Sequence, residues 1–384
     1  MNLRPYQQQA IQDLRRVYEQ GARSVCLYGP TGMGKTVIFA EIAKRAAANG
    51  RRTVILVHRD SLLQQATTKL MECGVPYSII APGHSYYGDC VSVASVQTLV
   101  RRLDRHEFDL IICDEGHHLV ADGYKRILAR WPLAHVLGVT ATPVRTDGRG
   151  LDEIFETLVL GPSIRELTAQ GFLTPAVVYA PARRLDLSGI RTRAGDYDRH
   201  QLADAMDTPT ITGDAVDHYR RLCPGVPAVV FCVSIQHAED VAADFAAAGF
   251  RSAAISGKMP VQHIRDTVAG LTDGRVQVLT SCDLISEGFD CPVVEAAILL
   301  RPTQSEALYI QQVGRALRPS PGKSRAVILD HSGNCFRHGM PDEEREWSLA
   351  GRQRRRGAPV AAVPVRQCPK CFACHKPAPM CPQC

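Results

Sequence analysis

Two stretches of the sequence decide the fold and the chemistry. The first reads Gly29-Pro30-Thr31-Gly32-Met33-Gly34-Lys35-Thr36, and the second reads Asp114-Glu115-Gly116-His117 after the apolar run Leu110-Ile111-Ile112-Cys113. The first matches the phosphate-binding loop G-x-x-x-x-G-K-[ST], with an apolar run at 24–28 before it and a helix-forming segment at 37–42 after it. The second ends a buried strand with two adjacent carboxylates, which suits Mg²⁺ binding and activation of a water. Together they predict ATP hydrolysis.

Each residue type in the phosphate loop has a physical role. Glycine has no Cβ, so backbone N–H groups can approach a triphosphate closely. Lys35 is expected to reach the β- and γ-phosphates, and Thr36 to bind Mg²⁺ through its hydroxyl. The helix that follows would direct its positive N-terminal end at the anion. The loop positions expected to surround the phosphates are Gly29, Thr31, Gly32 and Gly34.

Composition bounds the class of protein. With 384 residues, 45% of them hydrophobic and 22% charged, the chain should form two or more ordinary globular domains. The start, Met1-Asn2-Leu3-Arg4-Pro5, lacks the apolar core of a signal peptide, and no uncharged apolar stretch approaches a membrane span. The expected location is therefore the cytoplasm. The net charge of +6 and the basic run at 351–357 suit an anionic partner, although a solvated linker explains that run equally well.

Short apolar runs alternate with helix-patterned segments, which predicts an α/β fold with mostly parallel sheets covered by helices on both faces. A first series of apolar runs lies at 24–28, 53–57, 90–94, 109–113 and 136–140. A second series lies at 228–232, 252–255, 276–280, 296–300 and 325–329. Only the first contains a phosphate loop. The polar stretch 187–213 shows no pattern that indicates its role.

These patterns divide the chain into five parts. We expect an ATP-binding domain at 1–165, a connector and start of the second domain at 166–225, and a second parallel-sheet domain at 226–340. A basic linker rich in Pro and Ala follows at 341–367, and a cysteine-containing segment closes the chain at 368–384.

Eight segments occur in the order of the motifs of superfamily 2 helicases, and the chain resembles that superfamily over roughly residues 3 to 335. Segment 301–305 and the terminal cysteines make it most similar to the RadD-type DNA-repair helicases and related phage DEAD/DEAH-box helicases. The resemblance implies two RecA-like domains with a short zinc-ribbon-like segment. The motif segments are 4–7, 29–36, 57–59, 95–99, 114–117, 140–143, 285–290 and 311–318. Gly116 departs from the family's usual Ala or Cys.

The resemblance assigns roles around the nucleotide. Gln7, with Arg4 and Tyr6 beside it, would recognise adenine, since a side-chain amide both donates and accepts a hydrogen bond. Asp114 would hold Mg²⁺, and Glu115 would orient or deprotonate the attacking water. From the second domain, Gly288 and Asp290 resemble the motif that contacts the nucleotide sugar.

Arg315 and Arg318 lie three positions apart, so on a helix they project from one face. In the resemblance they reach the γ-phosphate across an interdomain cleft as arginine fingers, with Gln311 one turn earlier. The residues implied in coupling hydrolysis to domain movement are His117, Thr140 and Thr142.

Other positions match family contacts with a nucleic-acid backbone, which hydroxyl, amide and basic groups bind without reading bases. DNA is the favoured partner, although nothing in these residues separates DNA from RNA. The positions are His58, Arg59, Ser95, Gln97, Thr98, Ser234, Thr280 and Ser281.

Five of the 14 cysteines fall in the last 17 residues. Cys368, Cys371, Cys381 and Cys384 form C-x₂-C-x₉-C-x₂-C, two paired knuckles suited to tetrahedral Zn²⁺, and metal would supply the folding energy. Cys374 and His375 are alternative ligands of second rank. The ribbon could contact DNA or dock a protein partner.

The main hypothesis is an ATP-dependent helicase or translocase, with Mg²⁺ as cofactor, acting on DNA in repair or phage DNA metabolism. The alternative is an ATP-gated nucleic-acid clamp, or an ATPase that recruits a nuclease, without strand separation. A small-molecule kinase is disfavoured because no substrate domain is visible.

Overall fold

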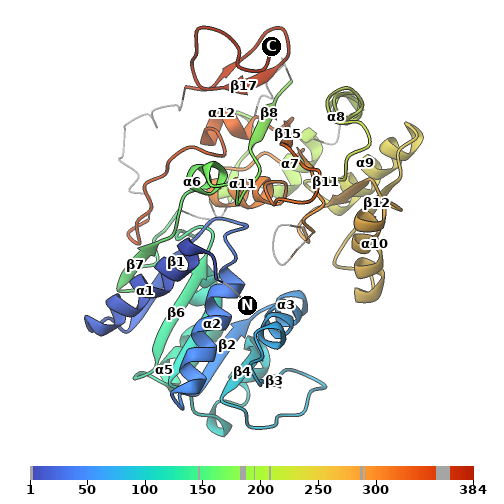
Figure 1. Ribbon diagram of the computed structural model, residues 1–384. Helices are drawn as coiled ribbons and strands as arrows, with labels where there is room; N and C mark the ends of the chain where they lie inside the picture. The colour runs from blue at the N-terminus through green and yellow to red at the C-terminus, as the bar shows by residue number, and fades with distance from the viewer. Residues whose placement is uncertain are drawn as a thin grey trace. The chain divides into compact units, whose positions relative to one another are not determined.

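The structure is a computed structural model that describes residues 3–145, 148–181, 187–193, 195–206, 209–285, 289, 291–351 and 364–384. The chain divides into two compact units. Unit 1 consists of Met1–Ser163 and Arg345–Arg354, and unit 2 consists of Ile164–Glu344 and Arg355–Cys384. Each unit is an α/β structure built on its own sheet (Figure 1).

The sheet of unit 1 is parallel throughout. Its seven strands within the described residues follow the order β3-β4-β2-β5-β6-β1-β7. Three of them, β1, β2 and β5, are buried at every residue, as expected where helices cover both faces of a sheet. The bounds are β1 Ser24–Tyr28, β2 Thr53–Val57, β3 Ser78–Ile80, β4 Val91–Ser95, β5 Leu110–Asp114, β6 His135–Thr140 and β7 Thr157–Leu160.

Helices pack on this sheet because one face of each is apolar. In α1, for example, Ala10, Ile11 and Leu14 are buried at helical spacing. One core cluster joins strand residues such as Val54 and Ile111 to Phe155. The helices of unit 1 are α1 Pro5–Glu19, α2 Lys35–Ala48, α3 Asp60–Glu72, α4 Val96–Val100 and α5 Asp122–Arg130, with 3₁₀ turns η1 Leu103–Arg105 and η2 Gly116–Val120.

Unit 2 contains a sheet of eight strands within the described part of the chain, in the order β12-β13-β11-β14-β15-β8-β17-β16. The first six are parallel, whereas β17 pairs antiparallel with β8 and with β16. Figure 1 shows β17, in red, beside β8, in green. The bounds are β8 Ala176–Tyr179, β11 Ala228–Phe231, β12 Ser252–Ile255, β13 Val278–Ser281, β14 Ala296–Leu299, β15 Ala326–Asp330, β16 Arg366–Gln367 and β17 Ala373–His375.

Helices of unit 2 complete its core. Tyr219 and Phe245 are fully buried and pack edge to face, with ring centroids 5.6 Å apart. The helices are α6 Ile164–Ala169, α7 Arg199–Met206, α8 Pro209–Leu222, α9 Ile235–Ala247, α10 Val261–Asp273, α11 Glu306–Gly314 and α12 Asn334–His338.

The polar stretch whose role the sequence did not indicate forms a hairpin, β9 Thr192–Arg193 and β10 Asp196–Tyr197, followed by α7. The Asp196 carboxylate accepts hydrogen bonds from the Thr303 hydroxyl at 2.9 Å and the Gln304 N–H at 2.7 Å. Ser305, next along, caps α11 by accepting from the Leu308 N–H at 3.3 Å. The insertion therefore fixes the loop that begins α11.

The expected linker is partly ordered within unit 1. The carbonyl of Leu349 accepts the N–H groups of Leu151 at 2.7 Å and Asp152 at 3.2 Å, and the Trp347 ring lies 5.2 Å from that of Tyr28. Residues 352–363, which include most of the basic run, lie outside the described residues.

The prediction of an α/β fold with two parallel sheets is confirmed. The segments β3, β7 and β8 are additional strands that the apolar runs did not indicate. Among the described helices, none is long and apolar enough to cross a membrane.

Candidate functional site

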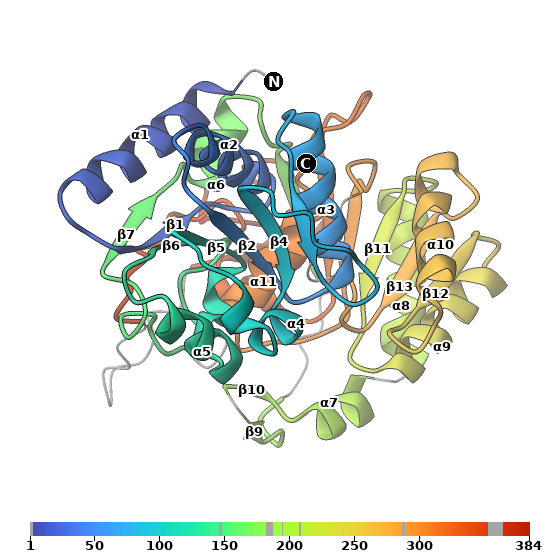
Figure 2. The same ribbon diagram turned by 90° about the horizontal axis from the view of Figure 1, so that it is seen from below.

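The carboxyl ends of the strands in unit 1 bring most predicted site residues to one edge of the sheet. The phosphate loop 29–36 follows β1, β6 ends at Thr140, and β5 ends at Asp114. The pairs 58–59 and 97–98 follow β2 and β4. Figure 2 shows these strands side by side in the order β4-β2-β5-β6-β1. Along this edge, the predicted nucleic-acid contacts after β4 and β2 come first and the acidic pair at the end of β5 comes next. The coupling threonines at the end of β6 and the phosphate loop after β1 follow.

The phosphate loop has the backbone that its glycines permit. Gly32 and Gly34 have φ values of 91° and 82°, in the left-handed region that other residues avoid. Lys35 starts α2, and its ammonium donates to the Gly29 carbonyl at 2.9 Å. Thr36 lies beside it in the first turn of the helix. These residues fit a triphosphate, because successive N–H groups and an ammonium converge at a helix N-terminus.

Gln7 supports the phosphate loop directly. Its amide oxygen accepts the Arg4 N–H at 3.0 Å, and its amide nitrogen donates to the Met33 carbonyl at 3.1 Å. The Tyr6 hydroxyl donates to the same carbonyl at 3.1 Å. The backbone angle favours glycine at Gly34, and a Cβ there would lie 2.6 Å from the Gln7 amide nitrogen, so a larger residue would displace the Gln7 side chain. The sequence predicted adenine recognition by Gln7, and the structure adds this loop contact.

The acidic pair is almost buried, each residue having 9% of its surface exposed. Asp114 ends β5, and its carboxylate accepts the Glu115 N–H at 3.1 Å. Glu115 has a left-handed backbone, with φ 56° and ψ 58°. Positive φ is uncommon for a residue other than glycine and turns the chain sharply at this point. Burial and both carboxylates raise the pKa of the adjacent Cys113 thiol, so this cysteine stays a neutral core residue.

His117 contacts both the acidic pair and β6. Its Nδ1 lies 3.2 Å from the Thr140 hydroxyl and 3.5 Å from Glu115 Oε2. Thr140 Oγ1 donates to the Thr142 carbonyl at 2.9 Å and accepts the Thr142 N–H at 3.1 Å. The Thr140 hydroxyl has a single proton, which it donates to the Thr142 carbonyl. In the hydrogen bond between His117 and Thr140, His117 Nδ1 must therefore carry the proton and act as the donor. The three residues predicted to couple hydrolysis to movement are therefore brought together.

Except for Thr98, the predicted nucleic-acid contacts in unit 1 have surface exposed to solvent. His58 and Arg59 are half-buried, and Gln97 is exposed. Gln97 accepts a hydrogen bond from the Ser95 hydroxyl at 2.9 Å, and Thr98 is buried in α4.

Three predicted contacts in unit 2 are hydroxyls that hydrogen-bond to the backbone of the chain. Thr280 has no exposed surface and donates its hydroxyl to the Ala238 carbonyl at 2.6 Å, which differs from the expectation of a phosphate contact. Ser234 caps α9 by accepting the His237 N–H at 3.0 Å. Ser281 is likewise buried and accepts the Leu284 N–H. Local side-chain to backbone bonding explains these hydroxyls without nucleic acid.

The arginines predicted to act on the γ-phosphate converge in unit 2. Arg315 and Arg318 donate to the same oxygen, the Phe289 carbonyl, at 2.6 Å and 3.1 Å. Gln311 lies on α11 with 6% of its surface exposed. Gly288 and Asp290, predicted to contact the sugar, lie outside the described residues.

One residue that the sequence did not indicate holds this arginine segment. The ammonium of Lys323 donates to the carbonyls of Val294 at 2.6 Å, Ala316 at 2.5 Å and Arg318 at 2.6 Å. Burial lowers its pKa to about 8, and the Arg318 charge contributes in the same direction. No motif or spacing distinguishes this lysine from the chain's other cations, so only the structure identifies it.

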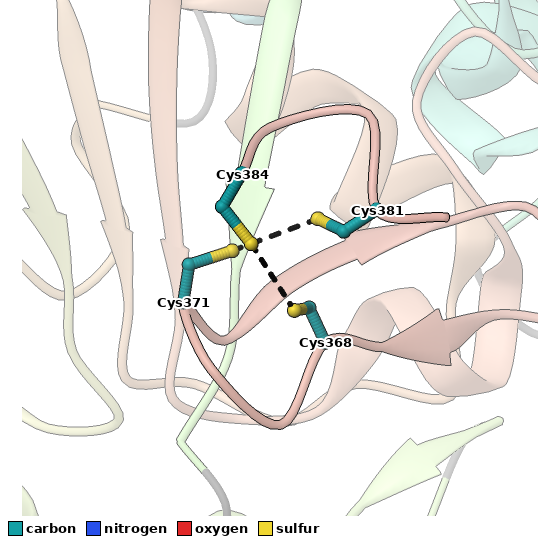
Figure 3. A group of neighbouring side chains, drawn as sticks. All are labelled: Cys368, Cys371, Cys381 and Cys384. Carbon is teal, nitrogen blue, oxygen red and sulfur yellow. Dashed lines mark hydrogen bonds between the residues drawn. The ribbon is translucent and has the colours of Figure 1, made fainter.

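The terminal cysteines form a compact cluster (Figure 3). The sulfur atoms of Cys368, Cys371, Cys381 and Cys384 lie within 4.8 Å of one another. Cys368 and Cys384 are 3.6 Å apart, and Cys371 and Cys381 are 3.7 Å apart. Four thiolates about 2.3 Å from a tetrahedral Zn²⁺ are separated by about 3.8 Å, whereas a disulfide bond measures about 2.05 Å. The cluster therefore fits zinc and not two disulfides.

The two alternative zinc ligands, Cys374 and His375, have other hydrogen-bond partners. Cys374 is buried, and its thiol is a hydrogen-bond partner of Cys335 in α12. The Nδ1 atom of His375 lies 2.6 Å from the Lys376 carbonyl. Neither belongs to the four-cysteine cluster.

Two family models match parts of the chain. A family described as Type III restriction enzyme, res subunit, matches residues 1–145, and one described as Helicase conserved C-terminal domain matches residues 215–320. A 51.5 kDa protein of a Lactococcus phage (isolate 7-9) is 32% identical over 349 residues, 90% of this chain and 74% of that protein.

A Saccharomyces cerevisiae protein assigned by name to the ATP-dependent helicases, IRC3, is 30% identical over 356 residues, which cover 86% of this chain. The match covers 51% of the yeast protein, so this chain spans about half the length of that relative.

Two solved structures share the fold. One is a fragment assigned as an HsdR subunit of a type I restriction enzyme from Vibrio vulnificus YJ016, with a TM-score of 0.70 at 22% identity, covering 88% of this chain and 65% of that chain. The other is the ATP-dependent Type ISP restriction-modification enzyme LlaBIII bound to DNA, with a TM-score of 0.65 at 16% identity, covering 86% and 27%. The RecA-like fold is thereby confirmed. The chain belongs to the superfamily 2 helicases and is an ATPase of that type, for which ATP and Mg²⁺ are the implied cofactors.

Proposed function

We propose that this chain is a DNA-stimulated ATPase that uses hydrolysis to move along DNA or to separate its strands. The observation that carries the proposal is the order of strand ends in unit 1, where residues 97–98 and 58–59 neighbour the acidic pair and the phosphate loop. Nucleic acid held at the first two positions would lie beside the groups that hydrolyse ATP. Binding and chemistry would then share one sheet edge.

Each residue would act in a defined way in this ATPase. The phosphate loop and Lys35 bind the phosphates, while Thr36 and Asp114 provide oxygen ligands for Mg²⁺. Glu115 orients the attacking water and accepts its proton. Arg315 and Arg318 would exchange the Phe289 carbonyl for phosphate oxygens in the ATP-bound state, since guanidinium groups bind such oxygens more strongly than a neutral carbonyl.

DNA as the partner is supported by the neighbour named as bound to DNA. The experiment measures ATP hydrolysis without nucleic acid and then with single-stranded DNA, duplex DNA and RNA, beside a Glu115→Gln control. We expect stimulation by DNA that the control loses. Stronger stimulation by RNA would reassign the partner, and indifference to all three would overturn the proposal.

Movement is tested separately from hydrolysis. We expect ATP-dependent displacement of streptavidin from biotinylated DNA, or release of a labelled strand from a partial duplex. If DNA stimulates hydrolysis while neither displacement occurs, the chain is an ATP-gated clamp. Extending the DNA tail on either side of the block would give the direction of movement.

We also propose that Cys368, Cys371, Cys381 and Cys384 bind one structural Zn²⁺, as their sulfur separations support. Bound metal would hold the segment that supplies β17 to the sheet of unit 2. Elemental analysis should give about one zinc per chain, in line with a single tetrahedral site. Cys371→Ser should lose the metal, whereas Cys374→Ser, which alters a cysteine outside the cluster, should keep it. Full zinc retention by Cys371→Ser would overturn the proposal.

A further inference from the structure

Three histidine rings form a continuous row along the carboxyl edge of unit 1. The rings of His117 and His118 are 4.2 Å apart between centroids, and those of His118 and His58 are 4.4 Å apart. Both distances correspond to direct ring contact. All three side chains are half-buried. His118 is therefore in contact with both neighbours, and the sequence analysis gave it no role.

The row connects two positions with different predicted roles. β2 and β5 are paired with Leu56 opposite Cys113, so the chain leaves both strands at the same level of the sheet. His58 and Arg59 follow β2, where a nucleic-acid backbone is expected. Glu115 follows β5 and is expected to orient the attacking water. The histidine row spans the space between these two strand ends.

At the catalytic end, the row touches a residue with little freedom. His117 Nδ1 lies 3.5 Å from Glu115 Oε2 and 3.2 Å from Thr140 Oγ1, and its proton is directed to that hydroxyl. Glu115 Oε2 is buried and has no hydrogen-bond partner among the described residues, so the His117 ring is the polar group that the structure gives it as a neighbour. A shift of the His117 ring would therefore alter where the Glu115 carboxylate lies.

We propose that His118 is a positioning residue that transmits nucleic-acid binding at His58 and Arg59 to Glu115 through ring contacts. This inference rests on the proposed function, because it requires that nucleic acid stimulates hydrolysis. Contact with a phosphate moves the His58 ring, His118 moves with it because the rings are packed, and His117 then sets the Glu115 carboxylate. Discrete packed side chains of this kind can couple two sites.

The test measures the stimulation ratio, which is kcat with saturating single-stranded DNA divided by kcat without it. His118→Ala removes both ring contacts and should lower this ratio by about three- to thirtyfold. His118→Phe keeps a planar ring and should restore most of it. The affinity for DNA, measured by fluorescence anisotropy without nucleotide, should change less than the ratio, since His118 acts after binding.

A matched control is His106→Ala. His106 is also half-buried in unit 1 and packs against the Tyr86 ring at 4.7 Å, but it lies outside the row. We expect an unchanged ratio. In a double-mutant cycle, the effects of His58→Ala and His118→Ala on the stimulation ratio should not add, because both substitutions interrupt the same series of ring contacts.

The outcomes separate this inference from the proposed function. If the wild-type chain is not stimulated by any nucleic acid, the proposed function fails first. If the wild type is stimulated and folded His118→Ala retains the full ratio, or loses both rates equally, then His118 does not transmit binding. Thermal melting of each variant identifies any that fail to fold, and His118→Phe then provides the decisive comparison.

Discussion

At Gly116, a side chain would clash with the backbone of the neighbouring strand β6. A Cβ at this position would be 2.9 Å from the Cα atom of Gly138 in β6. Gly138 is itself constrained, because a Cβ there would lie 2.2 Å from the ring of Phe155. The two glycines thus let η2, β6 and Phe155 pack in direct contact. This packing gives a physical reason for glycine where related helicases more often have Ala or Cys.

Gly116→Ala should therefore destabilise the protein by about 2 kcal/mol, the usual cost of overpacking a core, and lower the melting temperature by several degrees. Since residue 115 is adjacent, kcat for ATP should fall as well. Differential scanning calorimetry and steady-state ATPase assays would measure both effects. Gly123→Ala is the matched control, because its Cβ would meet Val96 at 3.4 Å, an ordinary contact, and a helical alanine is favoured. Melting of Gly116→Ala at the wild-type temperature would contradict this account.

Lys323 is a second residue whose role follows from its contacts. Lys323→Met keeps the length of the side chain but leaves three carbonyls without their shared donor. We expect a loss of about 1–3 kcal/mol in stability and a lower kcat, because the segment that carries Arg315 and Arg318 loses its anchor. Lys258→Met, at an exposed position in unit 2, should change neither quantity. A Lys323→Met enzyme with wild-type kcat would show that this anchor does not position the arginines.

Motifs in the sequence predict roles for residues such as Lys35 and Asp114, and the structure places Lys35 after β1 and Asp114 at the end of β5 in one sheet. It could not predict Lys323, because three carbonyls brought together by folding have no signature along the chain. The burial of the Thr280 side chain is likewise known only from the structure, because no local pattern indicates the burial of a single hydroxyl. Motifs thus predict which groups react, whereas the residues that support those groups depend on tertiary packing.

At the scale of elements, α8 and the end of β15 meet through two histidines. His331 has 4% of its surface exposed, and its Nε2 lies 3.2 Å from Nδ1 of His218. Burial lowers the pKa of His331 to about 3, with His218 contributing, and burial also lowers the pKa of His218. Both rings are therefore neutral in the folded protein at neutral pH.

The pH dependence of stability follows from this pair. In the unfolded chain a histidine has a pKa of about 6.5. Between about pH 6.5 and pH 3, His331 is therefore protonated in the unfolded state but neutral in the folded state. This stabilising contribution is present above pH 6.5 and is lost on acidification, at up to about 1.4 kcal/mol per pH unit for one group. Urea unfolding at pH 7.5, 6 and 5 should show a shallower decline for His331→Asn than for wild type. Exposed His84→Asn should follow the wild-type curve, and an identical slope in His331→Asn would rule out this residue as the cause.

The strands that the sequence indicates most clearly are buried apolar runs. Runs such as 53–57 and 110–113 are long, apolar and bounded by polar residues, which predicts buried parallel strands. β3 has only three residues, and only one of the four residues in each of β7 and β8 is buried, so these segments give a weaker signal. The pairing of β8 with β17 joins residues nearly 200 positions apart, and only folding brings them together.

At the scale of the whole molecule, the chain enters unit 1 twice. Unit 2 occupies the sequence between Ser163 and Arg345, so the segment that begins at Arg345 leaves one unit and adds to the other. Leu349 then packs against the core cluster that contains Leu151 and Phe155, and its carbonyl accepts two N–H groups. A segment that follows the second domain in sequence thus helps to hold the first domain together.

Leu349→Ala tests this arrangement in the full-length chain. Removing a half-buried leucine side chain should lower the stability of unit 1 by about 1–2 kcal/mol, less than for a fully buried leucine. Hydrogen exchange should locate the effect, because the N–H groups of Leu151 and Asp152 donate to the Leu349 carbonyl and should exchange faster in the variant. Leu133→Ala, at a position with 76% of its surface exposed, is the control and should leave these amides unchanged. Faster exchange confined to unit 2 would mean that the segment stabilises the second domain. Faster exchange in unit 1 would show that this segment, which follows the second domain in the sequence, stabilises the core of the ATP-binding domain.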